Sequence, residues 1–144
     1  MKIYTMGFNG KSAAQFFEPL RDNNISRLLD IRLNNTSQLA AFTKKNDLEY
    51  FMEKILGAEY HHLLLLAPPK ELLDKYKSDH DWDYYEIEYN AVLRSRDLES
   101  NIDRSLFDRD VVLLCSEETA DKCHRRLAAE FLMGILDVEA IVHL

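Results

Sequence analysis

The sequence predicts an α/β protein: a single domain over residues 1–144, with a mainly parallel central sheet covered by helices in a Rossmann-like three-layer arrangement. The clearest strand is the unbroken apolar run Val111–Leu114, which is typical of a parallel strand covered on both faces. A helical pattern over 120–134 and a last strand over 138–144 follow it. Strand, helix and strand at this spacing form a βαβ unit, so these two strands are expected to run parallel.

Short apolar runs alternate with helix signals through the first half of the chain. Ser12 and Gln15 have the spacing of a capping box, so a helix is expected to start there. A second helix is expected to open at Asn46 and to end at Gly57, which suits a C-cap position. Strands are expected over 3–6, 27–31 and 59–63.

The second half is expected to be mostly helical before the clear strand at 110–115. Pro68 and Pro69 predict a helix through Tyr76, because proline suits the first helical turn. Further helices are expected over 81–94 and 98–107. The aromatic residues of the first of these recur at spacings of three and four, which favours helix packing, with stacking on a base as the alternative. They are Trp82, Tyr84, Tyr85 and Tyr89.

Composition and charge restrict the class of partner. Lys and Arg number 18 and Asp and Glu number 25, which gives a net charge of −7. This excess disfavours nucleic acid as a partner, because such binding needs cations that displace counterions, although a local basic face stays compatible with it. The apolar run over 63–69 is too short to span a bilayer, so no membrane partner is expected. Two cysteines without a signal-peptide-like start indicate a cytoplasmic protein with free thiols.

Two thiols, a carboxylate, an imidazole and a guanidinium gather around the predicted turn from the strand at 110–115 to the last helix. In α/β proteins such turns face the ligand crevice at the carboxyl ends of the strands. The start of a helix also favours the thiolate form of a nearby cysteine. Cys115 and Glu117 are therefore the candidate catalytic residues. The alternative for Cys115 is a small apolar side chain that closes the strand.

Seven further residues are candidates for ligand binding: Tyr4, Thr5, Asp30, Arg32, Cys123, His124 and Arg125. The helical pattern places Cys123 in the middle of the apolar stripe, which favours a core position, and His124 at its edge. Arg125 falls on the opposite face, where a solvated surface is the simplest expectation. Asp30 and Arg32 alternate along a strand and so point to the same side, either as a buried ion pair or as a base beside an anion anchor.

No cofactor or metal is expected. Gly-x-Gly-x-x-Gly and P-loop sequences are both absent. Cys115, Cys123 and His124 could supply three ligands to a zinc ion, with His61 or His62 as a fourth. However, seven residues separate the two cysteines, which is not a standard zinc spacing.

These motifs resemble the bacterial and archaeal domain-of-unknown-function family 488 along essentially the whole chain. The matching segments are Tyr4–Gly7, Leu29–Arg32, Leu113–Glu117, Cys123–Ala128 and Val142–Leu144. The resemblance implies an α/β fold with a site at these motifs, but no reaction. Gly7-Phe8-Asn9 departs from the Gly-His-Ser that is common in the family, so an activity that used that histidine would be lacking here. The loop over 34–38 resembles one branch of the family.

The expected function is a pocket for an anionic small molecule or a nucleotide, with or without catalysis at Cys115. One alternative is a non-catalytic binding module linked to nucleic-acid metabolism, with a basic face made by Arg94, Arg96, Arg104, Arg109, Arg125 and Arg126. A second alternative is sulfur transfer through a Cys115 persulfide, since the layout is similar to that of rhodanese domains. Glu117 and Glu118 disfavour it, because carboxylates repel a persulfide anion. The sequence leaves the oligomeric state open.

Overall fold

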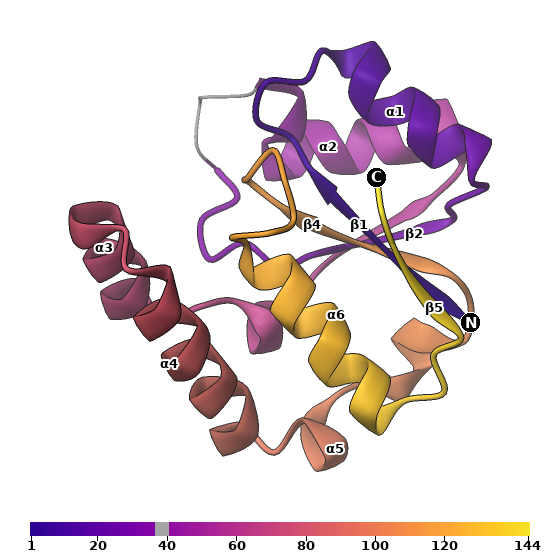
Figure 1. Cartoon of the computed structure of the whole chain (residues 1–144). Helices are drawn as coiled ribbons and strands as arrows, with labels where there is room; N and C mark the ends of the chain where they lie inside the picture. Colours follow the sequence, from indigo (N-terminus) through magenta and orange to yellow (C-terminus); the bar gives the residue numbers. More distant parts are fainter. Residues whose placement is uncertain (37–40) are drawn as a thin grey trace.

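Five parallel strands form the central sheet of the computed structural model, which describes residues 1–36 and 41–144 (Figure 1). The strands are β1 (Lys2–Gly7), β2 (Arg27–Asp30), β3 (Glu59–His62), β4 (Val111–Cys115) and β5 (Ala140–His143). Their order across the sheet is β3-β2-β4-β1-β5, and every neighbouring pair runs parallel. The predicted α/β fold with a mainly parallel sheet is therefore confirmed.

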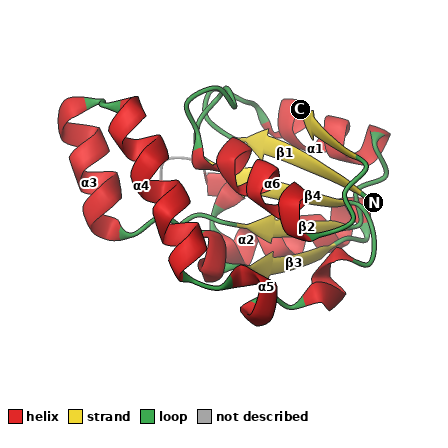
Figure 2. Cartoon of the chain, turned by 60° about the horizontal axis from the view of Figure 1, so that its bottom comes forward, coloured by secondary structure: helices red, strands yellow, loops and turns green. Residues whose placement is uncertain are grey.

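Helices cover both faces of this sheet and complete the three layers. They are α1 (Ala13–Asp22), α2 (Lys45–Phe51), α3 (Lys70–Asp79), α4 (Trp82–Ser95), α5 (Leu98–Asn101) and α6 (His124–Ile135). The helices α1 and α2 lie on one face, and α6 with α4 lies on the other (Figure 1). The helix α3 packs beside α4, and the pair extends beyond the sheet (Figure 2).

Side-chain alternation along β4 explains why its apolar run is unbroken. Val111 and Leu113 pack in the core that α4 and α6 cover, whereas Val112 and Leu114 pack in the core beneath α1 and α2. Successive side chains of a strand point to opposite faces, so a strand covered twice needs apolar residues at every position. Cys115, one step beyond Leu114, falls on the α6 side of the sheet.

The strand order creates a crevice at the carboxyl ends of β1 and β4. Gly7 and Cys115 are register partners at the ends of these adjacent strands. The helix after β1 covers one face and the helix after β4 covers the other (Figure 1). Adjacent strands whose chains leave to opposite faces define the switch point where open parallel sheets bind ligands.

The predicted helix ends of the first half are partly confirmed, and the one that differs is determined by a tertiary contact. The capping box of Ser12 and Gln15 is confirmed. A π-helical turn, Met52–Leu56, continues α2, and Gly57 ends it in the expected left-handed cap conformation, with φ of 61°. The prediction that the second helix starts at Asn46 is wrong. The helix begins at Lys45, whose amide donates to the carbonyl of Asn35 across the fold.

Two other helices were expected to be longer than they are. The segment 98–107 divides into α5 and a short 3₁₀ turn, because the Asp103 carboxylate accepts from the Ser105 amide and caps a new start. The last helix begins at His124 rather than at residue 120, so residues 116–123 form a loop. Within the described residues, no helix is both long and apolar enough to cross a membrane.

The layered core gives a first testable prediction. Leu113 is fully buried in β4, so Leu113→Ala should lower the free energy of unfolding by about 2–5 kcal/mol through lost burial and a residual cavity. Ile87→Ala on α4 is the matched control, because that side chain is 65% exposed and should change stability by less than about 0.5 kcal/mol. Urea denaturation followed by circular dichroism measures both. Equal effects of the two substitutions would contradict the assignment of Leu113 to the core.

Candidate functional site

Two cysteine side chains meet at the carboxyl end of β4 and the start of α6. Their Sγ atoms lie 2.6 Å apart, within hydrogen-bond distance, and both thiols are free. Each residue is only 2% exposed. Cys123 is the N-cap of α6, with an extended backbone, and the expected position in the middle of the helical stripe is wrong because the helix starts later. The late start turns Cys123 toward Cys115.

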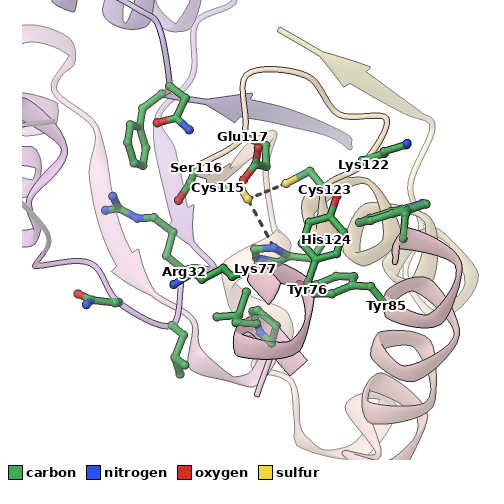
Figure 3. A pocket seen from close by; sticks show the side chains of 17 residues that line it. Arg32, Tyr76, Lys77, Tyr85, Cys115, Ser116, Glu117, Lys122, Cys123 and His124 are labelled. Atoms are coloured by element: carbon green, nitrogen blue, oxygen red, sulfur yellow. Dashed lines mark hydrogen bonds between the residues drawn. The ribbon is translucent and has the colours of Figure 1, made fainter. Parts of the chain in front are cut away.

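His124 completes this group from the first residue of α6. Its Nδ1 lies 3.5 Å from the Cys115 Sγ (Figure 3), and its Nε2 lies 3.0 Å from the carbonyl oxygen of Ile31. An imidazolium donates from both ring nitrogens, so a protonated His124 would donate one hydrogen bond to the sulfur and one to the carbonyl. The Ile31 carbonyl therefore orients the ring toward Cys115.

Of these three side chains, two are expected to be ionised, one as an anion and one as a cation. Burial alone raises the pKa of Cys115, but the hydrogen bond from Cys123 and the positive charge of His124 bring this pKa well below its usual value. Burial lowers the pKa of His124, and the Cys115 thiolate reverses this, so the net shift is upward. Burial and the neighbouring thiolate raise the pKa of Cys123 well above its usual value. The favoured state is a Cys115 thiolate, a His124 imidazolium and a Cys123 thiol.

Arg125 holds the loop between the two cysteines. Its guanidinium donates to the carbonyls of Glu117, at 2.6 Å, and Glu118, at 3.3 Å, and to the Thr5 hydroxyl at 3.3 Å. Arg125 is 1% exposed, so the expected solvated surface is wrong. The helix phase that begins at His124 directs residue 125 to the sheet, where it joins the loop to β1.

Gly7 permits the close approach of β1 to this loop. A Cβ atom at residue 7 would lie 1.6 Å from the Glu117 carbonyl oxygen and 2.8 Å from Nη1 of Arg125. No side chain fits at this position while the Arg125 hydrogen bonds are kept. Glycine at the end of β1 is thus required by the geometry of the loop.

Asp30 and Arg32 form a buried ion pair at the end of β2. Two hydrogen bonds, of 2.8 Å and 2.7 Å, join the guanidinium to both carboxylate oxygens, as expected from their alternation. Arg32 also donates to the Thr43 carbonyl, and the Tyr60 hydroxyl donates to Asp30 at 2.6 Å. Burial and the Asp30 carboxylate raise the pKa of Tyr60. The pair thus has the structural role considered for it, and Arg32 in addition lines the cavity described next.

A cavity of about 320 Å³ opens above the cysteine pair (Figure 3). Its wall combines the two thiols and His124 with aromatic and charged side chains from the loops after β1 and β2, from α3 and α4, and from the 116–123 loop. The aromatic ones are Phe8, Tyr76, Trp82 and Tyr85; the charged ones are Arg32, Lys77, Lys122 and Glu117. Partial burial and the negative charge of Cys115 raise the pKa of Glu117.

Five of the nine candidate residues line this cavity: Arg32, Cys115, Glu117, Cys123 and His124. The other four do not line it. Tyr4 belongs to the core under α1, on the far face of the sheet, while Asp30 is covered by Arg32. Thr5 and Arg125 bond to each other behind the loop, and Thr5 also contacts Nδ1 of His143 at 2.6 Å.

Several residues that line the cavity could not be recognised from sequence patterns. Tyr76 and Lys77 come from α3, which is distant in the chain, and Phe8 comes from the loop after β1. The Arg32 guanidinium lies 5.2 Å from the centre of the Phe8 ring. Of the distinctive 34–38 loop, Ser37 and Gln38 lie outside the described residues.

One group within the described residues has the donor atoms to hold a metal ion. The ligand atoms of Cys115, Cys123 and His124 all lie within 4.8 Å of one another. Two thiolates on one tetrahedral zinc are separated by about 3.8 Å, as follows from Zn–S bonds of about 2.3 Å. The observed 2.6 Å is shorter than this, so the two sulfurs do not have the spacing of two zinc ligands. Neither of the suggested fourth ligands joins the group, since His62 donates to the Arg32 carbonyl and His61 contacts Glu59.

The fold and the site define a parallel α/β protein with a buried thiolate–imidazolium pair in its switch-point cavity. The chain belongs to the family described as Domain of unknown function DUF488, whose model matches residues 12–132. No curated protein and no solved structure matches it. The resemblance found in the sequence motifs is thereby confirmed, and the site must be interpreted from its own chemistry.

The close contact at Gly7 gives a second prediction. Gly7→Ala should destabilise the protein by about 2 kcal/mol or more, because the methyl group meets a backbone carbonyl rather than a flexible side chain. Gly134→Ala in α6 is the control: it meets nothing within 4 Å and should gain up to about 1 kcal/mol from helix propensity. Urea unfolding of both variants checks this. A neutral Gly7→Ala would show that the loop does not need this contact.

Proposed function

We propose that this protein is a cysteine-dependent enzyme that acts on a small anionic molecule, with Cys115 as the nucleophile. The observation that carries the proposal is the contact of the Cys115 Sγ with both Cys123 and the Nδ1 of His124 at the base of a cavity. A thiolate is the reactive form of cysteine, and an adjacent imidazolium is the usual way to stabilise it.

The neighbouring groups have distinct roles in this proposal. His124 keeps Cys115 ionised and is itself held by the Ile31 carbonyl. Glu117 lines the cavity, and its raised pKa makes it a suitable proton donor or acceptor for a reacting group. Arg125 fixes the Glu117 backbone through its 2.6 Å hydrogen bond and thereby sets the position of that carboxyl group.

The lining of the cavity favours an anion that carries a flat or apolar part. Lys77 and Lys122 supply two cations against the single carboxylate of Glu117, while the Arg32 guanidinium is paired with Asp30. This positive lining is local, because the whole chain has a net charge of −7. Trp82 and Tyr85 form an aromatic wall, with their rings stacked at an interplanar angle of 17°. A nucleotide or an aromatic carboxylate combines these two features.

The two alternatives have weaker support. Three of the six arginines considered for a nucleic-acid face have other roles: Arg125 is buried, Arg126 pairs with Glu130, and Arg109 pairs with Asp108. Sulfur transfer keeps some support, since the Glu117 amide hydrogen-bonds to Cys115 as a persulfide cradle would. The Glu117 carboxyl group on the cavity wall opposes it.

Alkylation of Cys115 by iodoacetamide tests the nucleophile directly. The midpoint of its rate against pH should lie well below the roughly 8.5 of a free thiol, because His124 and Cys123 stabilise the thiolate. Removal of the imidazolium in His124→Gln should move the midpoint upward. The partly exposed His61, which lies outside the cavity, gives the control: His61→Gln should leave the midpoint unchanged. Mass spectrometry separates the two cysteines, and a wild-type midpoint like that of a free thiol would refute the role of Cys115.

A comparison of two reagents tests the preference for anions. The rate ratio of iodoacetate to iodoacetamide at Cys115 should exceed that of a small model thiol, because only iodoacetate carries a charge that the cavity attracts. Lys77→Gln should lower the ratio by roughly twofold to fivefold, the scale of one unit charge several ångströms away in a water-accessible site. Lys70→Gln on the same helix is the control, since Lys70 is exposed and pairs with Asp74 outside the cavity. A ratio equal to that of the model thiol would exclude an anionic substrate.

A further inference from the structure

The nucleophile proposed above has no need of a second cysteine, yet Cys123 is in contact with it. A hydrolytic or acyl-transfer enzyme releases its product with water or another acceptor. A second thiol in contact with the first can attack a mixed disulfide on it, form an internal disulfide and so release the bound half of the substrate.

We propose that the pair reduces small anionic disulfides, with Cys115 as the attacking thiol and Cys123 as the resolving thiol. This inference rests on the proposed role of Cys115 as the nucleophile of the cavity. Both cysteines line the cavity, so a disulfide that enters it can reach Cys115 and then be displaced by Cys123. The Sγ atoms need to approach by only about half an ångström from 2.6 Å to reach the roughly 2.05 Å of a disulfide bond.

The reaction proceeds in two balanced exchanges. The Cys115 thiolate attacks one sulfur of the substrate disulfide, forms a mixed disulfide and expels the other half as a thiolate. Cys123 then attacks the Cys115 sulfur, forms the internal disulfide and expels the second half, which takes the proton that Cys123 gives up. The protein loses two electrons and the substrate gains them. A further thiol or dithiol restores the protein by the same steps in reverse.

The electrostatics of the site place these steps in order. While Cys115 is a thiolate, its charge and its hydrogen bond keep Cys123 protonated and unreactive. Once Cys115 is in a mixed disulfide, both of these effects disappear; burial still raises the pKa of Cys123, while the positive charge of Arg125 lowers it. The resolving thiol is therefore easier to deprotonate after the first exchange than before it.

The lining of the cavity defines the disulfide. Carboxylate groups suit Lys77 and Lys122, and flat groups suit the wall of Trp82 and Tyr85. The aromatic dicarboxylate disulfide dithiobis(nitrobenzoate) has both features and releases a coloured thiolate for each half that leaves. It is the probe for the experiment.

Wild-type protein, reduced and then freed of reductant, should release two coloured thiolates per chain: a fast first one and a second that follows by resolution. Intact mass should then show a loss of two hydrogens and no adduct, and peptide mapping should show Cys115 joined to Cys123. Cys123→Ser should release one thiolate and retain a stable adduct on Cys115. Cys115→Ser should lose the fast phase. Circular dichroism confirms that both variants are folded, and the wild-type mass decides the matter even if one is not.

Two results would overturn the inference and leave the proposed function intact. One is a fast release of a single thiolate, with a lasting adduct on wild-type Cys115. The other is two adducts per chain without an internal disulfide. Absence of any fast phase that depends on Cys115 would refute the proposed function as well, so the two failures are distinguishable.

Discussion

A buried guanidinium holds the site together. Arg125 is almost wholly excluded from solvent, and its hydrogen bonds go to two loop carbonyls and the Thr5 hydroxyl, all uncharged oxygens. A buried cation is costly unless hydrogen bonds and nearby negative charge compensate for it. The hydrogen bonds fix the loop over β1 and β4, and the positive charge favours ionised groups around it, among them Glu117. The arrangement also needs glycine at position 7, since only a residue without a Cβ allows the loop to come so close.

The aromatic residues of α4 explain how a thiolate–imidazolium pair can persist away from water. Tyr89 is fully buried, donates from its hydroxyl to the Leu66 carbonyl and packs edge-on against the His124 ring, with the ring centres 5.6 Å apart. Tyr85 and Trp82 continue the stack toward the cavity. These packed aromatic rings keep the local dielectric constant low, which strengthens the attraction between Cys115 and His124. Helix packing, one of the two roles considered for these aromatic residues, thus also serves the site.

Local patterns in the sequence were sufficient for the fold and for the part of the site that lies on strand ends. The apolar run of β4 and the βαβ spacing predicted the parallel sheet, and Cys115 and Arg32 follow from their places at the ends of strands. The burial of Arg125 could not be predicted, because it depends on where α6 begins, and no capping side chain at Cys123 marks that start. The wall made by Tyr76 and Lys77 was also beyond prediction, since it depends on how α3 and α4 pack beyond the edge of the sheet.

Burial limits the reactivity of Cys115 in two ways. It admits only small molecules to a residue that is 2% exposed, and by itself it would raise the pKa of the thiol and suppress its reactivity. The reactivity therefore depends on the two hydrogen-bonding neighbours rather than on exposure. Each neighbour is in turn controlled by the thiolate, which raises the pKa of His124 and keeps Cys123 protonated. Any chemistry that removes the negative charge of Cys115 thus changes the protonation of both partners at once, and this coupling makes the three side chains a single functional unit.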